Sequence, residues 1–179
     1  MKINNPDSRK RNGMMTAIFL SVFLTLTVTL NAQTPADFSG KWVFDKTASD
    51  RDETGDASFT GTIILEIRQD ADTVSFSNTY IVNESRSVKM PGSSFLADGG
   101  VLPDNSGTDP AKKFIKWSQD RKTLTTNYIM TASIDGVAQD FLTATTYSLS
   151  ADGKTLTAEE LKSSKLNGDR KVKKIYRKK

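Results

Sequence analysis

The sequence predicts an all-β protein with a single domain: an antiparallel up-and-down meander of eight to ten strands that closes as a barrel. Three observations support this expectation. Apolar residues alternate with polar ones over most of the chain, short turn signals separate these runs, and no stretch after residue 32 keeps a helical period over three turns. Closure removes the edge strands that such a meander would expose. A sandwich of two sheets is the alternative.

The first half of the chain contains one clear hairpin. Apolar residues stand at alternate positions from Phe59 to Ile67 and again from Val74 to Val82, with a polar connection at residues 69–72. Further strands are expected at Gly40–Asp45, near Arg86–Met90 and near Phe114–Trp117. The polar segments Lys46–Ser58 and Ala97–Pro110 are expected to be loops.

The second half contains successive strands with strong turns between them. A long run from Leu124 to Ile134 ends at Asp135-Gly136, one of the strongest hairpin signals, and the chain returns from Phe141 to Leu149. The remaining turns and strands are Asp152-Gly153, Lys154–Ser163, Asn167–Asp169 and Arg170–Lys178. Hairpins at this short spacing are typical of an antiparallel meander.

The composition excludes several reaction classes. The 179 residues are 36% hydrophobic and 26% charged, as in an ordinary globular domain, and they contain neither cysteine nor histidine. The chain therefore has no disulfide, no thiolate nucleophile, no zinc-cysteine cluster and no imidazole for a Ser-His-Asp triad or a histidine-ligated metal. We expect no metal site and no cofactor.

Residues 1–32 have the pattern of a removable signal peptide. Four basic residues among the first 13 precede an apolar, hydroxyl-rich run from Met14 to Leu30, and Ala32 is a small residue where a signal peptidase would cut. The run is shorter than the roughly 20 residues that span a bilayer comfortably. We therefore expect residues 33–179 to be exported to the periplasm or outside the cell, with no membrane span after cleavage. An uncleaved N-terminal anchor is the alternative.

Charge is unevenly distributed along the exported part. Residues 33–179 carry 21 Lys or Arg against 20 Asp or Glu, yet residues 154–179 alone hold 10 basic and 3 acidic residues. A basic C-terminal end can contact anionic ligands or envelope lipids, and a solvated edge strand protected by lysines is the alternative. An exported protein rarely meets nucleic acid, so no nucleic-acid partner is expected. The oligomeric state stays open.

Short motifs at both ends carry a family resemblance. Residues 38–42 read Phe-Ser-Gly-Lys-Trp at the start of the first strand, residues 149–157 read Leu-Ser-Ala-Asp-Gly-Lys-Thr-Leu-Thr, and residues 176–178 read Tyr-Arg-Lys. The chain resembles the lipocalin and fatty-acid-binding-protein group, and in particular the small lipocalin-like (calycin-type) domains of exported proteins in Bacteroidota and similar bacteria. The resemblance implies a lipocalin-like, ligand-binding barrel over nearly all of residues 33–179.

Gly40, Trp42 and Arg177 form the structural part of this resemblance. Gly40 would permit close backbone approach where the strand begins, and Trp42 would plug one end of the barrel with a large apolar surface whose indole N–H needs an acceptor. In lipocalins a basic residue of the last strand stacks on this Trp, and Arg177 matches it by position. These are structural roles, and no residue of the chain is expected to be catalytic.

The last strand also supplies the candidate ligand-binding residues, Lys174 and Tyr176. If Val172 and Tyr176 face the interior, Lys174 does too, because the three share one parity, and a buried lysine needs an anion. Fatty-acid-binding proteins end in a similar Arg-x-Tyr that holds the ligand carboxylate, whereas here Lys replaces the Arg fork. The opposite parity, with Ile175 inside and Lys174 in solvent, is the alternative.

The expected activity is reversible binding of a small apolar or amphipathic molecule in the barrel interior. The rival is a non-enzymatic interaction or envelope accessory module, such as an inhibitor, that acts through its loops and basic C-terminal strand. A continuous interior void would favour the binder. An enzyme would require carboxylates, Tyr or Lys that converge in a pocket with perturbed pKa values. The binding expectation rests on analogy of fold.

Overall fold

Alternating apolar and polar residues build one antiparallel sheet. The computed structural model describes residues 34–51, 56 and 58–179, and the expected signal peptide, residues 1–32, lies outside them. Within the described residues the strands are β1 Gly40–Phe44, β2 Thr62–Gln69, β3 Thr73–Asn83, β4 Arg86–Lys89, β5 Ser93–Leu96, β6 Leu102–Asp104, β7 Ala111–Trp117, β8 Thr123–Ile134, β9 Val137–Leu149, β10 Thr155–Ser164 and β11 Gly168–Lys178.

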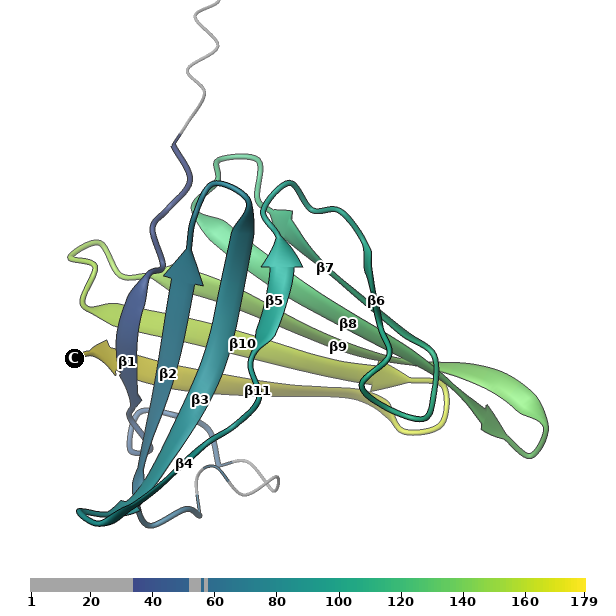
Figure 1. Cartoon of the computed structure of the whole chain (residues 1–179), viewed down its shortest axis with the longest axis horizontal. Coiled ribbons are helices and arrows are strands. Elements are labelled where there is room, and N and C mark those ends of the chain that lie inside the picture. Colours follow the sequence, from purple (N-terminus) through teal and green to yellow (C-terminus); the bar gives the residue numbers. More distant parts are fainter. Residues whose placement is uncertain (1–33, 52–55, 57) are drawn as a thin grey trace, which may run out of the picture. The chain divides into compact units, whose positions relative to one another are not determined.

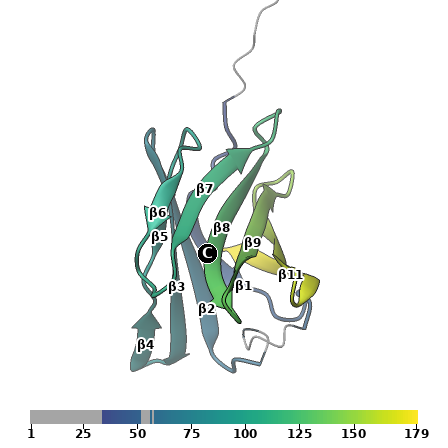
Figure 2. The same ribbon diagram turned by 90° about the vertical axis from the view of Figure 1, so that its right-hand side faces the viewer.

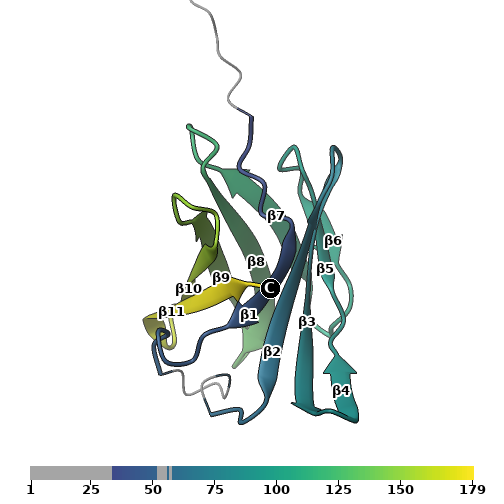
Figure 3. The same cartoon turned by 90° about the vertical axis from the view of Figure 1, so that its left-hand side faces the viewer.

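The strands form a single ladder that folds over on itself. Their order is β4-β3-β2-β1-β11-β10-β9-β8-β7-β6, and β5 pairs with the first half of β3. Figure 1 shows β1, β2, β3 and β5 running steeply across β8–β11 behind them, and Figures 2 and 3 show these groups of strands from the two sides. Because β1 pairs with β11, at Phe44 opposite Tyr176, both groups belong to one continuous sheet. The predicted antiparallel meander with a barrel-like fold is confirmed, and the two-sheet sandwich is wrong.

The two ends of the ladder approach each other between β5 and β7. No backbone ladder joins these two strands in the part of the chain that the structure describes. Side chains bridge them instead: Trp117 Nε1 donates a hydrogen bond to the Ala97 carbonyl oxygen at 3.2 Å, and Lys113 Nζ lies 6.0 Å from the ring centroid of Phe95. The seam is therefore closed by packing and not by strand pairing.

The sheet has 11 strands, more than the eight to ten expected, because the short strands β5 and β6 were not predicted. β4 pairs with the second half of β3 and β5 with its first half, and Pro91-Gly92 interrupts what would otherwise be one partner strand. The segment Ala97–Pro110, expected to be a loop, contains β6, which pairs with β7 over only three residues. Strands this short carry too few alternating residues to be recognised by periodicity.

Glycines determine two local features of the hairpins. In the turn between β8 and β9, Asp135 and Gly136 have φ of 51° and 78°, the left-handed conformation that a tight two-residue hairpin needs, so the predicted turn is confirmed. Strand β2 begins at Thr62, later than the expected start at Phe59. A Cβ on Gly61 would lie 2.1 Å from the Ile81 carbonyl oxygen and 2.6 Å from the Phe59 ring, so only glycine fits where the chain joins β2.

The buried core fills one end of the barrel. Its members lie mainly on the inward faces of the strands and on the segment before β1: Phe38, Trp42, Leu65, Ile67, Val74, Phe76, Phe95, Ile115, Leu124, Leu156, Ala158 and Tyr176. Trp42 is fully buried, and its Nε1 donates to the Phe38 carbonyl oxygen at 2.9 Å. The segment before β1 is held by Gln69, whose side chain accepts from the Phe38 N–H and donates to the Ala36 carbonyl.

Two details of the Trp42 motif differ from expectation. Arg177 does not stack on Trp42: the Arg177 side chain is 55% exposed, and its Nε donates to Asp45 Oδ2 at 3.1 Å. Lys178 stands directly opposite Trp42 in the β1–β11 register, and its Nζ lies 5.3 Å from the indole. Gly40 is needed for its φ of +138° and not for close approach, because a Cβ there would make only ordinary contacts.

Candidate functional site

The parity of β11 decides which of its residues face the interior. Tyr176 belongs to the core, and Lys174, two residues earlier on the same face, has a side chain that is only 13% exposed. Ile175 is also buried, although it faces the other way. The chain that follows β1 covers it: Ser49 Oγ accepts from the Ile175 N–H at 2.8 Å, and the Ile175 carbonyl accepts from the Asp45 N–H. Lys174 and Tyr176 therefore share the inner face, and the alternative with Lys174 in solvent is wrong.

Lys174 lies in a cluster of charged and hydroxyl groups that we call the polar cluster: Asp56, Tyr80, Glu160 and Lys174. The Lys174 Nζ lies 2.8 Å from Asp56 Oδ2 and 3.8 Å from Glu160 Oε2. Tyr80 on β3 donates its hydroxyl proton to Asp56 Oδ1 at 3.0 Å. These contacts join β3, β10, β11 and the connection between β1 and β2. The negative charge that a buried lysine needs is thus supplied by the protein itself.

The polar cluster includes one tyrosine, Tyr80, and two more, Tyr147 and Tyr176, border it. Burial raises the pKa of Tyr80, with the Asp56 carboxylate adding to the effect. Burial also raises the pKa values of Tyr147 and Tyr176 well above the ordinary value, and nearby groups, Tyr147 for Tyr176 and Glu160 for both, act in the same direction. These hydroxyls stay protonated at neutral pH. They can donate hydrogen bonds to a ligand, but they are poor proton donors in an acid–base reaction.

Tyr147 marks the border between the apolar core and the rest of the inner face. Its ring stacks on Phe76 of β3, with ring centroids 4.9 Å apart. In the register of β9 and β10, Tyr147 stands opposite Ala158, and the next inward pairs are Thr145 with Glu160 and Thr143 with Lys162. The inward positions thus change from apolar to polar within two residues along each strand.

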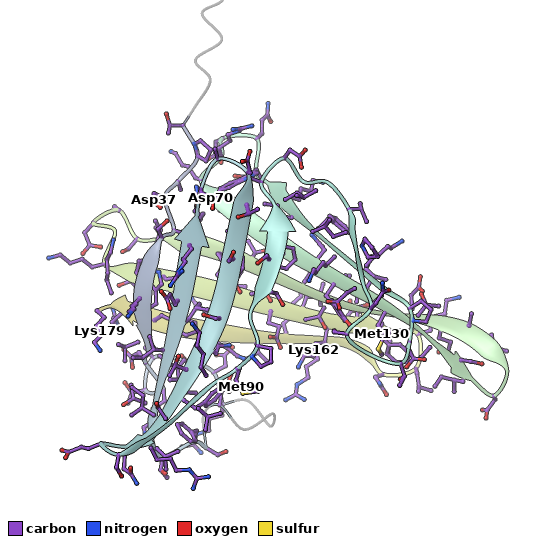
Figure 4. The ribbon with its side chains drawn as sticks, in the orientation of Figure 1. Asp37, Asp70, Met90, Met130, Lys162 and Lys179 are labelled. Carbon is purple, nitrogen blue, oxygen red and sulfur yellow. The ribbon has the colours of Figure 1, made fainter. Side chains whose placement is uncertain are left out.

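A cleft lies beyond the polar cluster on the same sheet, and we call it the inner cleft. It has a volume of about 430 Å³, and the lining residues used below are Phe141, Thr143, Lys162, Ser164, Asn167 and Arg170. Three neighbouring strands contribute to it: β9, β10 and β11. Figure 4 labels Lys162 of β10, which lines the cleft. It also labels Met130 of β8, which stands opposite Phe141 in the register of β8 and β9. The volume falls within the range of small-molecule sites in proteins.

Two buried side-chain oxygens of the inner face, Asn78 Oδ1 and Gln139 Oε1, have no hydrogen-bond partner among the described residues. Asn78 lies on β3 opposite Leu65, on the face that carries Phe76 and Tyr80, and its Oδ1 is buried without a hydrogen bond to any described residue. An unsatisfied buried acceptor costs about 1–3 kcal/mol, so such an atom calls for a water molecule or a ligand donor. Asn78 therefore adds an acceptor to the inner face.

Several residues of this region were not found from the sequence. Asp56 stands in a segment expected to be a solvated loop, and Glu160, Lys162 and Arg170 were not singled out. Alternation along the expected strands would have placed Glu160 and Lys162 on the face of Leu156 and Ala158, and this signal was available. No local signal could have shown that Asp56 reaches Lys174.

The structure holds no metal-binding cluster within its described ranges: no three or more Asp, Glu, His or Cys side chains are grouped so that they could ligate an ion. Over the same residues there is no helix with the length and apolar character needed to cross a membrane. Carboxylates, a lysine and tyrosines do converge on the inner face, but the carboxylates pair with lysines and the tyrosines are held neutral. This arrangement is suited to hydrogen bonding and charge pairing.

Comparisons with known proteins give remote likenesses only. No protein-family model matches the chain, and no curated protein matches it. Among solved structures, it is similar to one described as "REP1-NXSQ fatty acid transporter", with 13% identity and a TM-score of 0.46 over 80% of this chain and 97% of that one. It is also similar to a Schistosoma mansoni fatty acid binding protein in complex with arachidonic acid, with 14% identity and a TM-score of 0.47 over 79% of this chain and 96% of that one. Likenesses this distant carry no argument about function.

Proposed function

We propose that the protein binds a small amphipathic molecule on the inner face of its sheet. The observation that carries this proposal is the inner cleft of about 430 Å³, which lies beyond the polar cluster on the same sheet and is lined by an aromatic ring, hydroxyls and two cations. Small-molecule sites commonly combine apolar walls with a few polar groups in this way. The apolar part of the ligand packs against Phe141, and its polar part meets the hydroxyl and charged side chains.

We include Lys174 and Tyr176 in the site as the residues at its inner limit. Glu160 connects them to the cleft, because its carboxylate lies 3.2 Å from Lys162 Nζ and 3.8 Å from Lys174 Nζ. The neutral hydroxyl of Tyr176 and the unsatisfied Oδ1 of Asn78 are further groups to which a ligand could hydrogen-bond. No step of this function requires catalysis.

The test is a fluorescence titration with Nile red, an uncharged apolar dye. We expect the full chain to bind the dye and Thr143→Trp, which fills the cleft from β9, to bind it at least about tenfold more weakly. The matched control is Ser133→Trp, which adds the same side chain on the exposed face of β8 and leaves binding unchanged. Absence of dye binding by the native chain, or equal binding by the Thr143 variant, would contradict the proposal.

Export is a separate part of the proposed function. The basic and apolar pattern of residues 1–32, followed by Ala32, supports cleavage and release of the rest of the chain from the cytoplasm. Fractionation of the producing cells with intact-mass analysis tests it. We expect a periplasmic or extracellular product that begins at Gln33, and an uncleaved chain retained in the cytoplasm would contradict export.

A further inference from the structure

The outer face of the sheet carries a group of apolar side chains. Strand residues that alternate with the core residues Ile115, Leu124 and Leu156 point outward, and a solvated outer face is normally polar. Five neighbouring outward residues on β7–β10 are instead apolar and only half-buried, and we call them the outer patch: Phe114, Ile129, Leu142, Ala144 and Leu161. Within the described part of the chain, none of them belongs to the core or packs against it.

The outer patch is continuous across four strands. Ile129 stands opposite Leu142, and Ala144 stands opposite Leu161. Phe114 lies in the same row of the ladder as Ala144, on the other side of β8. In Figure 1 β8–β10 lie behind β1–β3, so the outer patch is on the side turned away from the viewer. Apolar patches on a protein surface often mark an interaction site.

Charged residues flank the outer patch at its two margins. On β7, the exposed residues Lys112 and Lys116 stand on either side of Phe114. On β10, the exposed residue Glu159 stands two positions before Leu161 and shares its face. The β7 margin is therefore basic, and the β10 margin offers a carboxylate.

A two-fold axis parallel to the strands, placed between β8 and β9, makes this face complementary to itself. Such an axis sets β7 of one copy over β10 of the other and β8 over β9, and it leaves the position along each strand unchanged. Residues that share a row of the ladder then face each other across the interface. The facing pairs are apolar or of opposite charge: Ile129 with Leu142, Phe114 with Leu161, and Lys116 with Glu159, one residue from each copy.

An axis that runs across the strands suits the same face less well. If it passed through Phe114, it would set Lys112 of one copy against Lys116 of the other, because these two residues lie on either side of Phe114. Like charges that face each other across an interface oppose association. The distribution of charge therefore favours the axis parallel to the strands.

The outer face is hollowed beside the outer patch. A cleft of about 300 Å³ lies where β10 and β11 meet, and the outward residues that line it include Thr146, Glu159, Leu161 and Lys171. In the two-fold arrangement Phe114 of the partner subunit faces Leu161, so its ring points toward this cleft. An aromatic side chain seated in a pocket commonly supplies much of the binding energy of a protein interface.

We propose that the outer patch binds a second copy of this chain, in a dimer whose two-fold axis runs parallel to β8 and β9. The same residues of both copies form such an interface. Two sheets that pack face to face in this way keep their strands within about 30° of each other. An apolar centre with a charged rim is the usual anatomy of a protein interface. The inner cleft lies on the opposite face of the sheet, so this inference does not depend on the proposed function.

Sedimentation equilibrium of the chain isolated from its producing cells measures the association. The outer patch is small, so we expect a reversible dimer with a Kd of about 1–100 μM. Phe114→Asp should weaken dimerisation at least about tenfold, because it places a charge at the centre of the interface. The matched control is Val101→Asp, which changes a side chain that is 61% exposed outside the outer patch and should leave the Kd unchanged. Circular dichroism verifies that each variant is folded.

Charge reversal tests the two-fold arrangement itself. Lys116→Glu sets two carboxylates against each other at each Lys116–Glu159 contact, and Glu159→Lys sets two ammonium groups against each other. Each variant alone should therefore dimerise about tenfold more weakly than the native chain. An equimolar mixture of the two variants should form a heterodimer about as stable as the native dimer, because both contacts then join opposite charges again.

The inference is overturned if the native chain stays monomeric at about 1 mM, or if Phe114→Asp dimerises as well as the native chain. It is also overturned if the charge variants dimerise normally on their own, or if mixing them does not recover association. A monomeric chain that instead sediments with phosphatidylglycerol vesicles, and no longer does so as Phe114→Asp, would show that the outer patch serves a lipid surface and not a second copy.

Discussion

Lys178 Nζ lies 5.3 Å from the ring centroid of Trp42, and the two residues stand directly opposite each other where the first and last strands pair. The exposed Lys178 side chain thus packs against an indole that is fully buried. The indole N–H donates to the Phe38 carbonyl. The two ends of the described chain thus meet at the buried end of the barrel, opposite to where the inner cleft lies along β9–β11.

Replacing Trp42 should strongly destabilise the fold. We expect Trp42→Ala to lower the free energy of unfolding by about 3–5 kcal/mol, because a fully buried indole is replaced by a cavity. Trp42→Phe keeps most of the packing but leaves the Phe38 carbonyl without its donor, so we expect a smaller loss of about 1–3 kcal/mol. Chemical denaturation followed by circular dichroism measures both. Equal losses for the two variants would show that volume does not explain the role of Trp42.

Gly61 should not tolerate a side chain. A Cβ at this position would lie 2.1 Å from the Ile81 carbonyl oxygen, so Gly61→Ala has to displace backbone, and we expect a loss of about 1–3 kcal/mol in the free energy of unfolding. Gly107→Ala is the matched control, since a Cβ there meets no atom within 4 Å. Urea denaturation of both variants makes the comparison, and a Gly61 variant as stable as the Gly107 variant would contradict the close approach.

The ion pair between Lys174 and Asp56 should show coupling in a double-mutant cycle. Lys174→Met leaves two partly buried carboxylates without their shared cation, and we expect it to destabilise the protein by about 1–3 kcal/mol. Adding Asp56→Asn to this variant should recover part of the loss, because one uncompensated charge is then removed. If the effects of the two single substitutions simply add, the pair makes no energetic contribution to the fold.

Stability should fall at alkaline pH because of the buried tyrosines. The pKa of Tyr176 is raised in the folded state above its ordinary value of 10.0. Below about pH 10 both states hold the proton and the contribution to stability is complete, whereas above it the unfolded state ionises first, so the free energy of unfolding decreases. We expect Tyr176→Phe to show a shallower decrease between about pH 9 and about pH 11. Denaturation at several pH values measures the slopes, and identical slopes would contradict the assignment.

Much of the fold was predictable because its signals are local. The strands around Asp135-Gly136 alternate over many residues and end in a turn that only a few residue pairs can form. Strands β5 and β6 were missed because they span four and three residues, which is too short for a period to show. The apolar character of Ile175 left open that it faces the interior. It faces outward and is buried because the chain around Ser49 covers the outer face of β11.

The site was less predictable because its contacts are not local. Lys174 was recognised from the parity of one strand, yet its partner Asp56 lies more than a hundred residues away in a connection with no strand pattern. Arg177 was predicted to stack on Trp42, whereas in the structure Lys178, one residue later, does so. A shift of one position along a strand moves a side chain to the opposite face, so such contacts need the register, which the sequence does not supply.

Binding on the inner face is the central claim, and amide NMR of the full chain titrated with 1-anilinonaphthalene-8-sulfonate, a soluble amphipathic anion, tests it most directly. We expect chemical-shift changes to concentrate on Phe141–Thr143, Lys162–Ser164 and Gly168–Arg170, around the inner cleft. The outer-face strand positions Lys116 and Ser133 should remain unperturbed. Changes confined to the outer face, or no saturable change at all, would contradict binding in the interior.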